Sequence, residues 1–238
     1  MRGRLLDIVY PRRCEICGGE SDRDGSHICS DCIDRIPFIP AKGVCRVCSR
    51  HVEGVADGFL CGDCAGANAP CFDIAVSAVR YEDKVREAIQ AYKFNGSFHM
   101  EKDFAEWMVA AARARLDVAA VDVVVPVPVT WWRRIDRGFN QSAYLAKDVA
   151  KAIGRRCDAF AMRRAGRPKR QSGLDEEARR ENAKGTFAVR KAPWVRGRTV
   201  LVVDDIMTTG ATFSECAKVL KEAGAWRVWC LSLARSVV

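Results

Sequence analysis

The chain has 238 residues, of which 49% are hydrophobic and 29% charged, and its formal net charge is +9. This apolar content is sufficient for a packed core, but no segment approaches the length of a membrane span, and the basic start of the chain lacks the apolar stretch of a signal peptide. We therefore expect a cytoplasmic protein without membrane insertion, in which cysteines stay reduced.

The first part of the chain contains four Cys-x-x-Cys pairs separated by short spacers. Their members are Cys14, Cys17, Cys29, Cys32, Cys45, Cys48, Cys61 and Cys64. Eight thiolates in four such knuckles fit two tetrahedral, structural Zn²⁺ sites. The simplest pairing is sequential, with the first four cysteines on one ion and the last four on the other. The spacing also allows a cross-braced pairing.

Two other uses of these cysteines compete with zinc. A disulfide framework needs an oxidising compartment, and a redox Cys-x-x-Cys motif belongs beside a βαβ pattern, which does not surround these pairs. His27 and His51 are near enough in sequence to replace a ligand, although the cysteine count is already complete. Eight zinc-bound thiolates and two Zn²⁺ would contribute −4, which leaves +5 of the formal +9.

Residues 1–69 are therefore expected to form an N-terminal helix and a double zinc ribbon, and residues 70–238 a domain of ordinary catalytic size. In this second part the pattern predicts strands at 74–81, 121–127, 157–162, 186–189, 200–203 and 228–234. It predicts helices at 84–94, 104–116, 141–153 and 211–223. Pro126 and Pro128 are expected to break the second strand, because proline cannot continue a central ladder. The alternation predicts an α/β fold with a doubly wound, mostly parallel sheet.

Two loops of this domain are rich in arginine and polar residues. Residues 125–141, VPVPVTWWRRIDRGFNQ, place a proline-shaped loop with Arg133, Arg134 and Arg137 just beyond a strand end. Residues 164–187 form a longer basic stretch, punctuated by Gln171, Leu174, Arg179, Asn182, Gly185 and Phe187. The positive excess favours polyanions as ligands, although arginine runs are often only solvated surface.

Residues 199–212, TVLVVDDIMTTGAT, are the most informative stretch of the chain. An apolar strand ends in Asp204 and Asp205, at the edge where ligands bind in open α/β sheets. The turn and helix start that follow suit a phosphate through free N–H groups and hydroxyls, and comprise Thr208, Thr209, Gly210, Ala211 and Thr212. Because carboxylates accept from vicinal hydroxyls, a ribose 5-phosphate matches both halves. A plain strand followed by a Thr-capped helix is the simpler alternative. The stretch resembles the phosphoribosyl pyrophosphate (PRPP) loop of type I phosphoribosyltransferases.

Together these elements resemble the ComF family of bacterial proteins over nearly the whole chain. The resemblance rests on the four knuckles, the PRPP loop, Arg-Gly-Phe-Asn-Gln at 137–141 and Gln-x-x-Leu…Arg-x-x-Asn-x-x-Gly-x-Phe at 171–187. One position departs, because Pro168 stands where the pattern leads us to expect threonine. The resemblance implies a PRPP-binding type I phosphoribosyltransferase domain behind a double zinc ribbon. It also implies a role in natural transformation or the handling of internalised single-stranded DNA, with that DNA and a competence helicase as partners.

Residue by residue, the resemblance implies a site for PRPP with Mg²⁺. The ribose diol would bind Asp204 and Asp205, the 5-phosphate would bind residues 208–212, and the pyrophosphate would bind Val127 and Pro128 with Arg133 and Arg134. Further contacts are expected from Arg137, Asn140, Gln141, Gln171 and Arg179. If catalysis occurs, pyrophosphate leaves carbon 1 of the ribose, with Asp204, Asp205, Arg133 and Arg134 as the catalytic residues. Residues 163–184 would close over the ligand and exclude water.

Three functions fit this sequence. The first is a ComF-like phosphoribosyltransferase-domain protein of DNA uptake. The second is a non-catalytic adaptor that senses PRPP or a nucleotide and docks on DNA or a helicase. The third is a nucleobase-salvage or amidophosphoribosyl transferase, which the zinc ribbons and the lack of a glutaminase domain weaken. The sequence does not identify the acceptor or a general base.

Overall fold

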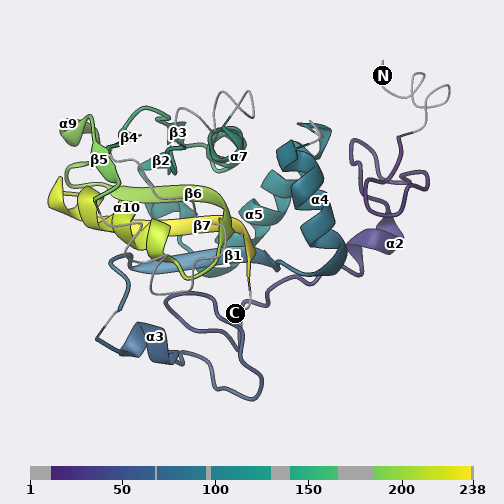
Figure 1. Ribbon diagram of the computed structural model, residues 1–238, viewed down its shortest axis with the longest axis horizontal. Helices are drawn as coiled ribbons and strands as arrows, with labels where there is room; N and C mark the ends of the chain where they lie inside the picture. The colour runs from purple at the N-terminus through teal and green to yellow at the C-terminus, as the bar shows by residue number, and fades with distance from the viewer. Residues whose placement is uncertain (1–11, 68, 95–97, 130–139, 166–184, 237–238) are drawn as a thin grey trace.

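The computed structural model describes residues 12–67, 69–94, 98–129, 140–165 and 185–236. Within them, five strands form a parallel sheet in the order β1-β7-β6-β2-β3 (Figure 1). Their bounds are β1 (Ile74–Arg80), β2 (Val123–Pro126), β3 (Arg156–Cys157), β6 (Thr199–Met207) and β7 (Arg227–Arg235). The prediction of an α/β fold with a mostly parallel sheet is confirmed. The expected N-terminal helix falls outside the described residues.

Alternate residues of the central strand β6 enter two separate cores, one on each face of the sheet. Leu201 and Val203 belong to one buried cluster, and Val200 and Val202 belong to the other. This is why the strand reads as an unbroken apolar run: in a sheet covered on both faces, every side chain is buried. The sequence pattern therefore predicts both the strand and its central position.

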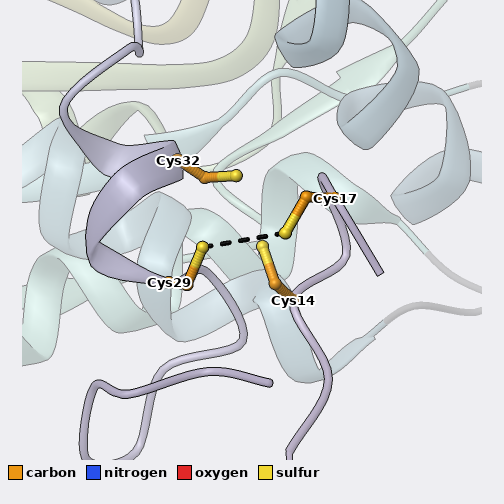
Figure 2. Close-up of side chains that lie close together, drawn as sticks. All are labelled: Cys14, Cys17, Cys29 and Cys32. Carbon is orange, nitrogen blue, oxygen red and sulfur yellow. Dashed lines mark hydrogen bonds between the residues drawn. The ribbon is translucent and has the colours of Figure 1, made fainter. Parts of the chain in front are cut away.

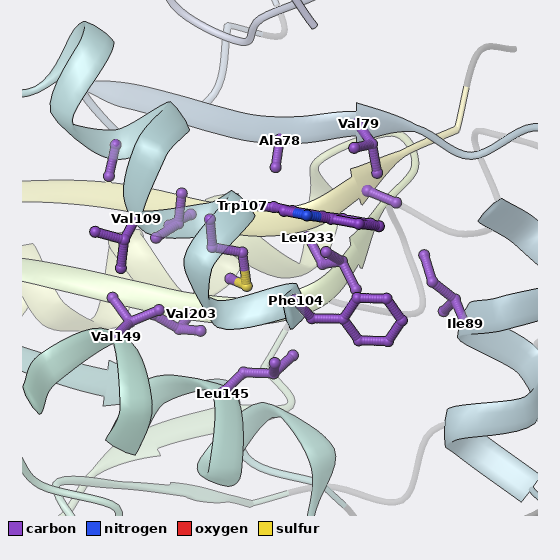
Figure 3. Close-up of a cluster of buried hydrophobic side chains, with 14 of the residues drawn as sticks. Ala78, Val79, Ile89, Phe104, Trp107, Val109, Leu145, Val149, Val203 and Leu233 are labelled. Carbon is purple, nitrogen blue, oxygen red and sulfur yellow. The ribbon is translucent and has the colours of Figure 1, made fainter. Parts of the chain in front are cut away.

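Helices cover both faces of the sheet, as a doubly wound fold requires. On one face, α5 (Glu101–Arg115) and α7 (Gln141–Ala152) pack against β1, β2, β6 and β7. Figure 3 shows this core, where Phe104 and Leu145 lie near Val203 and Leu233. On the other face lies α10 (Ala211–Glu222), which contacts β6 and β7. The helix α4 (Asp83–Phe94) follows β1 and contributes Ile89 and Tyr92 to the first core.

The strand β2 ends at Pro126, where the sequence predicts a break, although this proline still pairs as the last residue of an internal strand. Pro126 pairs with Val203 in the parallel register of β2 and β6. In that register the backbone N–H of Val127 donates to Val203 O (2.8 Å), so position 126 directs its nitrogen toward β3. Because β3 ends at Cys157 and pairs only with Val123 and Val124, no ladder bond is lost there.

The strand expected at 157–162 needs a correction. The structure instead has β3 and, after a turn, β4 (Met162–Arg164), which pairs antiparallel with β5 (Phe187–Val189) in a separate two-stranded sheet. Asp158 explains the interruption, because its side chain accepts from Phe160 N (2.9 Å) and closes a turn. The remaining short helices are η1 (Phe98–Met100), η2 (Val118–Ala120) and α9 (Ala192–Val195).

The cysteine-rich segments pack directly on this sheet domain. They contain two one-turn helices, α2 (Ser30–Ile33) and α3 (Gly62–Ala65). Between them, Phe38 forms an antiparallel bridge with Val79, and Ile39 N donates to Ala78 O (2.9 Å). This connector therefore covers the exposed edge of β1, which would otherwise offer unpaired backbone groups. No helix in the described part of the chain is long and apolar enough to cross a membrane.

Candidate functional site

The eight cysteines gather into two four-cysteine groups, and the sequential pairing is confirmed. The first group is Cys14, Cys17, Cys29 and Cys32, and the second is Cys45, Cys48, Cys61 and Cys64. In each, the Sγ atoms lie within 4.8 Å of one another. Figure 2 shows the first group, where Cys17 Sγ lies 3.8 Å from Cys29 Sγ. In a tetrahedral site with Zn–S bonds of about 2.3 Å, sulfurs lie about 3.8 Å apart, so both groups are consistent with a structural zinc ion.

The two groups are built by the same local structure. Each begins with a knuckle in which a cysteine amide and carbonyl hold a tight turn: Gly18 N donates to Cys14 O (2.8 Å), and Ser49 N donates to Cys45 O (3.0 Å). In each group the third cysteine precedes a one-turn helix and the fourth lies within it: Cys29 comes before α2 and Cys61 before α3. His27 and His51 belong to neither group.

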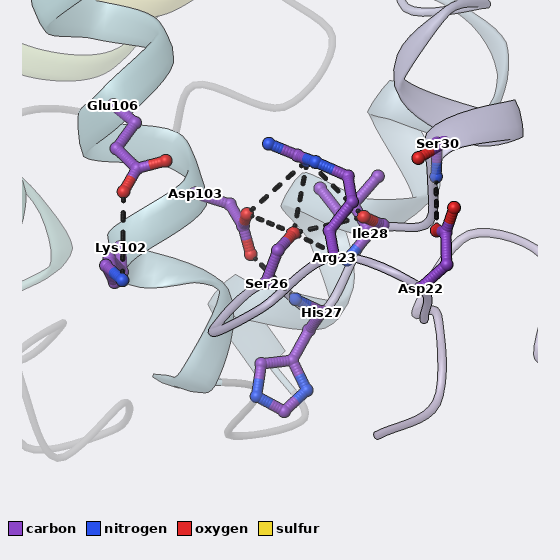
Figure 4. Close-up of polar contacts among 9 residues, drawn as sticks. All are labelled: Asp22, Arg23, Ser26, His27, Ile28, Ser30, Lys102, Asp103 and Glu106. Atoms are coloured by element: carbon purple, nitrogen blue, oxygen red, sulfur yellow. Dashed lines mark hydrogen bonds and ion pairs between the residues drawn. The ribbon is translucent and has the colours of Figure 1, made fainter. Parts of the chain in front are cut away.

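A buried carboxylate holds the first group against α5. Asp103 is 2% exposed and accepts from Ser26 Oγ (2.5 Å) and from the backbone of His27 (3.0 Å), as Figure 4 shows. Arg23 lies 4.0 Å from the same carboxylate. Nearby, His99 and Glu15 form a 2.6 Å contact. The first group is thereby attached to the start of α5 through charge-assisted hydrogen bonds.

At the carboxyl end of β6, the two aspartates occupy the position that the sequence predicts for ligand contacts. Both are partly exposed. Asp204 Oδ1 accepts from Ser142 Oγ on α7 (2.7 Å) and from the backbone N–H of Asp205 (2.9 Å). These bonds fix the orientation of the Asp204 carboxylate. Ser142 was not singled out by the sequence, although its place in the first turn after Asn140 and Gln141 could have suggested it.

Residues 207–214 run from the last residue of β6 into the first turn of α10, and we call them the β6–α10 segment. Gly210 has φ +81°, and a Cβ there would lie 2.8 Å from Met207 Cε, so this position requires glycine. Ser214 N donates to Gly210 O (2.8 Å), and Ala211 N donates to Thr209 Oγ1 (3.3 Å). The tight turn starts α10 at the carboxyl edge of the sheet. Thr208 and Thr212 are partly exposed beside it.

The end of β2 lies beside the end of β6. Val127 is buried and paired to Val203 through its backbone, and Pro128 is partly exposed. Asn140 and Gln141 stand at the start of α7, with Gln141 2% exposed. The structure therefore brings these residues to the same sheet edge as Asp204. The other predicted ligands lie outside the described residues, namely Arg133, Arg134, Arg137, Gln171 and Arg179.

Three further carboxyl groups, Glu215, Glu101 and Asp148, were not predicted from the sequence. Glu215 on α10 accepts from Gly185 N (2.7 Å), which anchors the chain as it enters β5. Burial, and then the charge of Asp148 and a hydrogen bond with it, raises the pKa of Glu101 to about 7. Burial followed by the charges of Glu101, Asp205 and Asp148 raises the pKa of Tyr92. The negative potential of these groups attracts cations and hydroxyl donors.

Comparisons with known proteins agree with this architecture. Residues 5–65 match the double zinc ribbon domain model, and residues 140–236 match the phosphoribosyl transferase domain model. "Competence protein F" of Haemophilus influenzae is 28% identical over 229 residues, which cover 94% of this chain and 97% of the relative. "DNA utilization protein YhgH" of Escherichia coli K12 is 30% identical over 207 residues, covering 79% and 89%. "Competence protein ComFC" of Streptococcus pneumoniae is 26% identical over 213 residues, covering 89% of each.

Fold and comparisons define a double zinc ribbon joined to a phosphoribosyltransferase-type domain. The chain belongs to the ComF family, together with proteins named for competence and DNA utilization.

Proposed function

We propose that this chain binds PRPP, with Mg²⁺, at the carboxyl end of β6 and acts in natural transformation or in the handling of internalised single-stranded DNA, in a cytoplasm that keeps its thiols reduced. The observation that carries the proposal is the convergence of Asp204, the start of α10 at Gly210 and the end of β2 on one sheet edge. Ligands of open α/β sheets bind at this edge.

Each part of PRPP has a counterpart in this site. The oriented carboxylate of Asp204, with Asp205, would accept hydrogen bonds from the ribose hydroxyls. The N–H groups at the start of α10, with the hydroxyls of Thr208 and Thr212, would bind the 5-phosphate. Mg²⁺ would neutralise charge on the pyrophosphate group. The names of the relatives support the role in DNA handling.

Calorimetry of PRPP with Mg²⁺ tests this proposal. Replacing Asp204 and Asp205 together by asparagine removes two charged acceptors without creating a core cavity, and should weaken binding by about 3 to 6 kcal/mol, or two to four decades. The matched control is Asp117→Asn with Asp122→Asn, which removes the same charge near the opposite end of the strands and should leave the affinity unchanged. Equal PRPP affinity in the site variant and the wild type would refute the assignment of this edge.

A pyrophosphate-release assay separates an enzyme from an adaptor. PRPP and Mg²⁺ would be incubated with the wild-type protein and a panel of nucleobases and amines. Release that depends on one acceptor would identify a transferase of salvage or amidotransferase type. If PRPP binds but no acceptor causes release of pyrophosphate, the result would favour a non-catalytic adaptor that docks on DNA or on a helicase.

A basic aromatic surface favours direct binding of single-stranded DNA as a second part of the function. It comprises Arg156, Lys191, Trp194, Arg198, Trp226 and Arg227. Arg156 lies 4.0 Å from the Trp194 ring, with Lys191 and Arg198 within 6 Å of it (5.6 and 5.7 Å). Trp226 is 69% exposed, its backbone N–H donates to Arg198 O (2.9 Å), and Arg227 lies 6.0 Å from its ring. Exposed rings stack on bases, and arginines neutralise phosphates.

This surface lies at the amino ends of β3, β6 and β7, opposite the proposed PRPP site. Fluorescence anisotropy with a labelled oligothymidylate measures its contribution. Trp226→Ala should weaken binding by about 1 to 3 kcal/mol through lost stacking, and Arg198→Ala should lower the salt dependence by about one phosphate contact. Lys42→Ala, a charge change in the second ribbon, is the control. Trp131 and Trp132, which lie beside Arg133 and Arg134 in the sequence, are further candidates for stacking but fall outside the described residues.

A further inference from the structure

The second four-cysteine group is connected to the β6–α10 segment through Arg235 at the end of β7. This arginine is 5% exposed, and its Nη1 donates to Cys48 O (2.8 Å). Arg235 also pairs with Met207 in the register of β7 and β6. The next residue, Ser236, donates its N–H to Met207 O (2.9 Å). One side chain thus joins a cysteine ligand of the second group to the first residue of the segment.

A second arginine fixes the same knuckle from α5. Arg115 donates from Nη2 to Cys45 O (3.2 Å) and from Nη1 to Ser49 Oγ. Ser49 is fully buried at φ +59°, a conformation that glycine adopts at the matching position 18 of the first knuckle. Its Oγ also donates to Ala75 O in β1 (2.6 Å). A serine is held in this costly conformation because its hydroxyl joins the knuckle to the sheet.

Arg115 and Arg235 also compensate the negative charge of the second four-cysteine group. Four thiolates around one Zn²⁺ carry a net charge of −2, and a buried charge of this size needs compensation. Arg115 and Arg235 supply two positive charges beside the second group. The bound metal and the arginines therefore stabilise one another.

A second connection runs from the second group to α10 through the chain that follows it. Cys71 N donates to Ser214 Oγ (2.9 Å), in the first turn of the helix. The ring of Phe72, which is 4% exposed, lies beside Gly210, since a Cβ built there would be 3.5 Å from Phe72 Cε1. The segment 207–214 is therefore supported at Met207 by one route and at Gly210 and Ser214 by another.

The first group makes a different set of contacts in the described part of the chain. Its attachments run to Asp103 on α5 and to His99 in η1. Cys14, Cys29 and Cys32 belong to the buried cluster of the α5 face, whereas Cys45, Cys48 and Cys61 belong to the cluster of the α10 face. The two groups are alike in local structure but support opposite faces of the sheet.

We infer that metal binding at the second four-cysteine group, but not at the first, holds the β6–α10 segment in its ordered conformation, with Arg235 as the positioning residue. The site for the ribose phosphate is then assembled only when the second ribbon is loaded. This consequence for ligand binding rests on the proposed function, whereas the order of the segment does not.

Hydrogen exchange of the full chain without ligand, measured together with zinc content, tests the inference. Cys45→Ser should lower the zinc content by one ion and raise exchange in peptides covering 207–214 by about tenfold. The matched variant Cys14→Ser should also lose one ion but raise exchange in 207–214 much less than Cys45→Ser does. Unchanged exchange in Cys45→Ser, or an equal rise in Cys14→Ser, would overturn the inference.

Two variants that keep all eight cysteines test the same inference if Cys45→Ser or Cys14→Ser fails to fold. Arg235→Met keeps an unbranched apolar side chain but removes the charge and the donor, and Ser214→Ala removes the acceptor for Cys71 N. Each should retain two zinc ions and raise exchange in 207–214, with Arg235→Lys closer to wild type and Lys218→Ala, on the exposed side of α10, unchanged. Wild-type exchange in both Arg235→Met and Ser214→Ala would contradict the inference. PRPP binding to the wild-type protein is measured separately. If PRPP does not bind, the exchange results for residues 207–214 still stand.

Discussion

Ser142 Oγ donates a 2.7 Å hydrogen bond to Asp204 Oδ1, and this bond joins the first turn of α7 to the carboxyl end of β6. The same oxygen accepts from the backbone of Asp205. Asp204 is therefore held in one orientation by a neighbouring helix rather than by its own strand alone. In a site of this kind, a positioned carboxylate binds hydroxyls without first losing side-chain freedom.

Replacing Ser142 by alanine should weaken PRPP binding by about 1 kcal/mol, or roughly fivefold, because the Asp204 carboxylate loses one donor and becomes less ordered. Calorimetry gives the affinity, and thermal unfolding shows whether the fold is retained. Lys151→Ala, at the exposed far end of the same helix, should bind as the wild type does. An unchanged affinity in Ser142→Ala would show that this bond has no role in ligand binding.

Gly210 is expected to be less tolerant of alanine than another glycine of similar conformation. Gly197 has φ +69° with no atom within 4 Å of a built Cβ, whereas a Cβ at Gly210 meets Met207 Cε at 2.8 Å. Gly197→Ala should therefore cost only the backbone term of about 1 kcal/mol, and Gly210→Ala should cost more because Met207 must also move. Chemical denaturation measures both, and equal losses would mean that the Met207 contact is relieved at no cost.

Much of this fold can be predicted from the sequence, because its strongest signals are local. Residues 200–203 are predicted to form a buried strand, and they lie within β6. The cysteine spacing defines the knuckles, and the structure selects the sequential pairing by bringing each set of four sulfurs together. A position such as Gly210 follows from turn chemistry alone. These features depend on neighbours in the chain, which a sequence displays directly.

The features that the sequence does not predict depend on residues far apart in the chain. Pro126 is tolerated inside the sheet only because β3 is short, which cannot be read from residues 121–127. Arg115 and Arg235 look like ordinary basic residues until the fold places them beside Cys45 and Cys48. Ser142 becomes relevant only when α7 meets β6. Much of the candidate site therefore depends on contacts between polar groups that are far apart in the sequence.

Glu101 should make the stability of the fold depend on pH. Burial and Asp148 raise its pKa from 4.5 to about 7, so the folded state binds this proton more tightly than the unfolded chain does. The stabilisation is complete below pH 4.5 and is lost as the pH rises through about 7. Glu101→Gln should therefore gain stability relative to wild type between pH 5 and pH 8, by roughly 1 kcal/mol after allowing for solvent screening.

Thermal unfolding at several pH values checks this difference. Glu106→Gln on the same helix is the control, since its partner is the exposed Lys102 at 3.9 Å. The pKa of His27, which burial lowers, is the same in all three proteins, so its titration cancels in the comparison. A constant difference between Glu101→Gln and wild type across this range would contradict the prediction.

Zinc should leave the two four-cysteine groups at different rates. Cys17 of the first group is exposed, whereas Cys45, Cys48 and Cys61 of the second are buried and Cys64 is intermediate. A chelator therefore reaches the first ion more easily, and we expect two phases of release separated by about tenfold or more, because the second site opens only with the surrounding core. A colorimetric chelator assay resolves the phases. Cys14→Ser should remove the fast phase, and Cys45→Ser the slow one.

The shared packing also predicts what metal loss does to the sheet domain. From the cysteine series alone, chelation would be expected to unfold the first part of the chain and spare the sheet. In the structure, Cys14 and Cys29 belong to the same buried cluster as Phe104 and Leu233, so loss of the first ion should loosen that core. We expect the unfolding temperature of the whole chain to fall in two steps that follow the two phases of zinc release. A sheet that unfolds at the same temperature with and without both ions would show that the ribbons and the sheet are energetically independent.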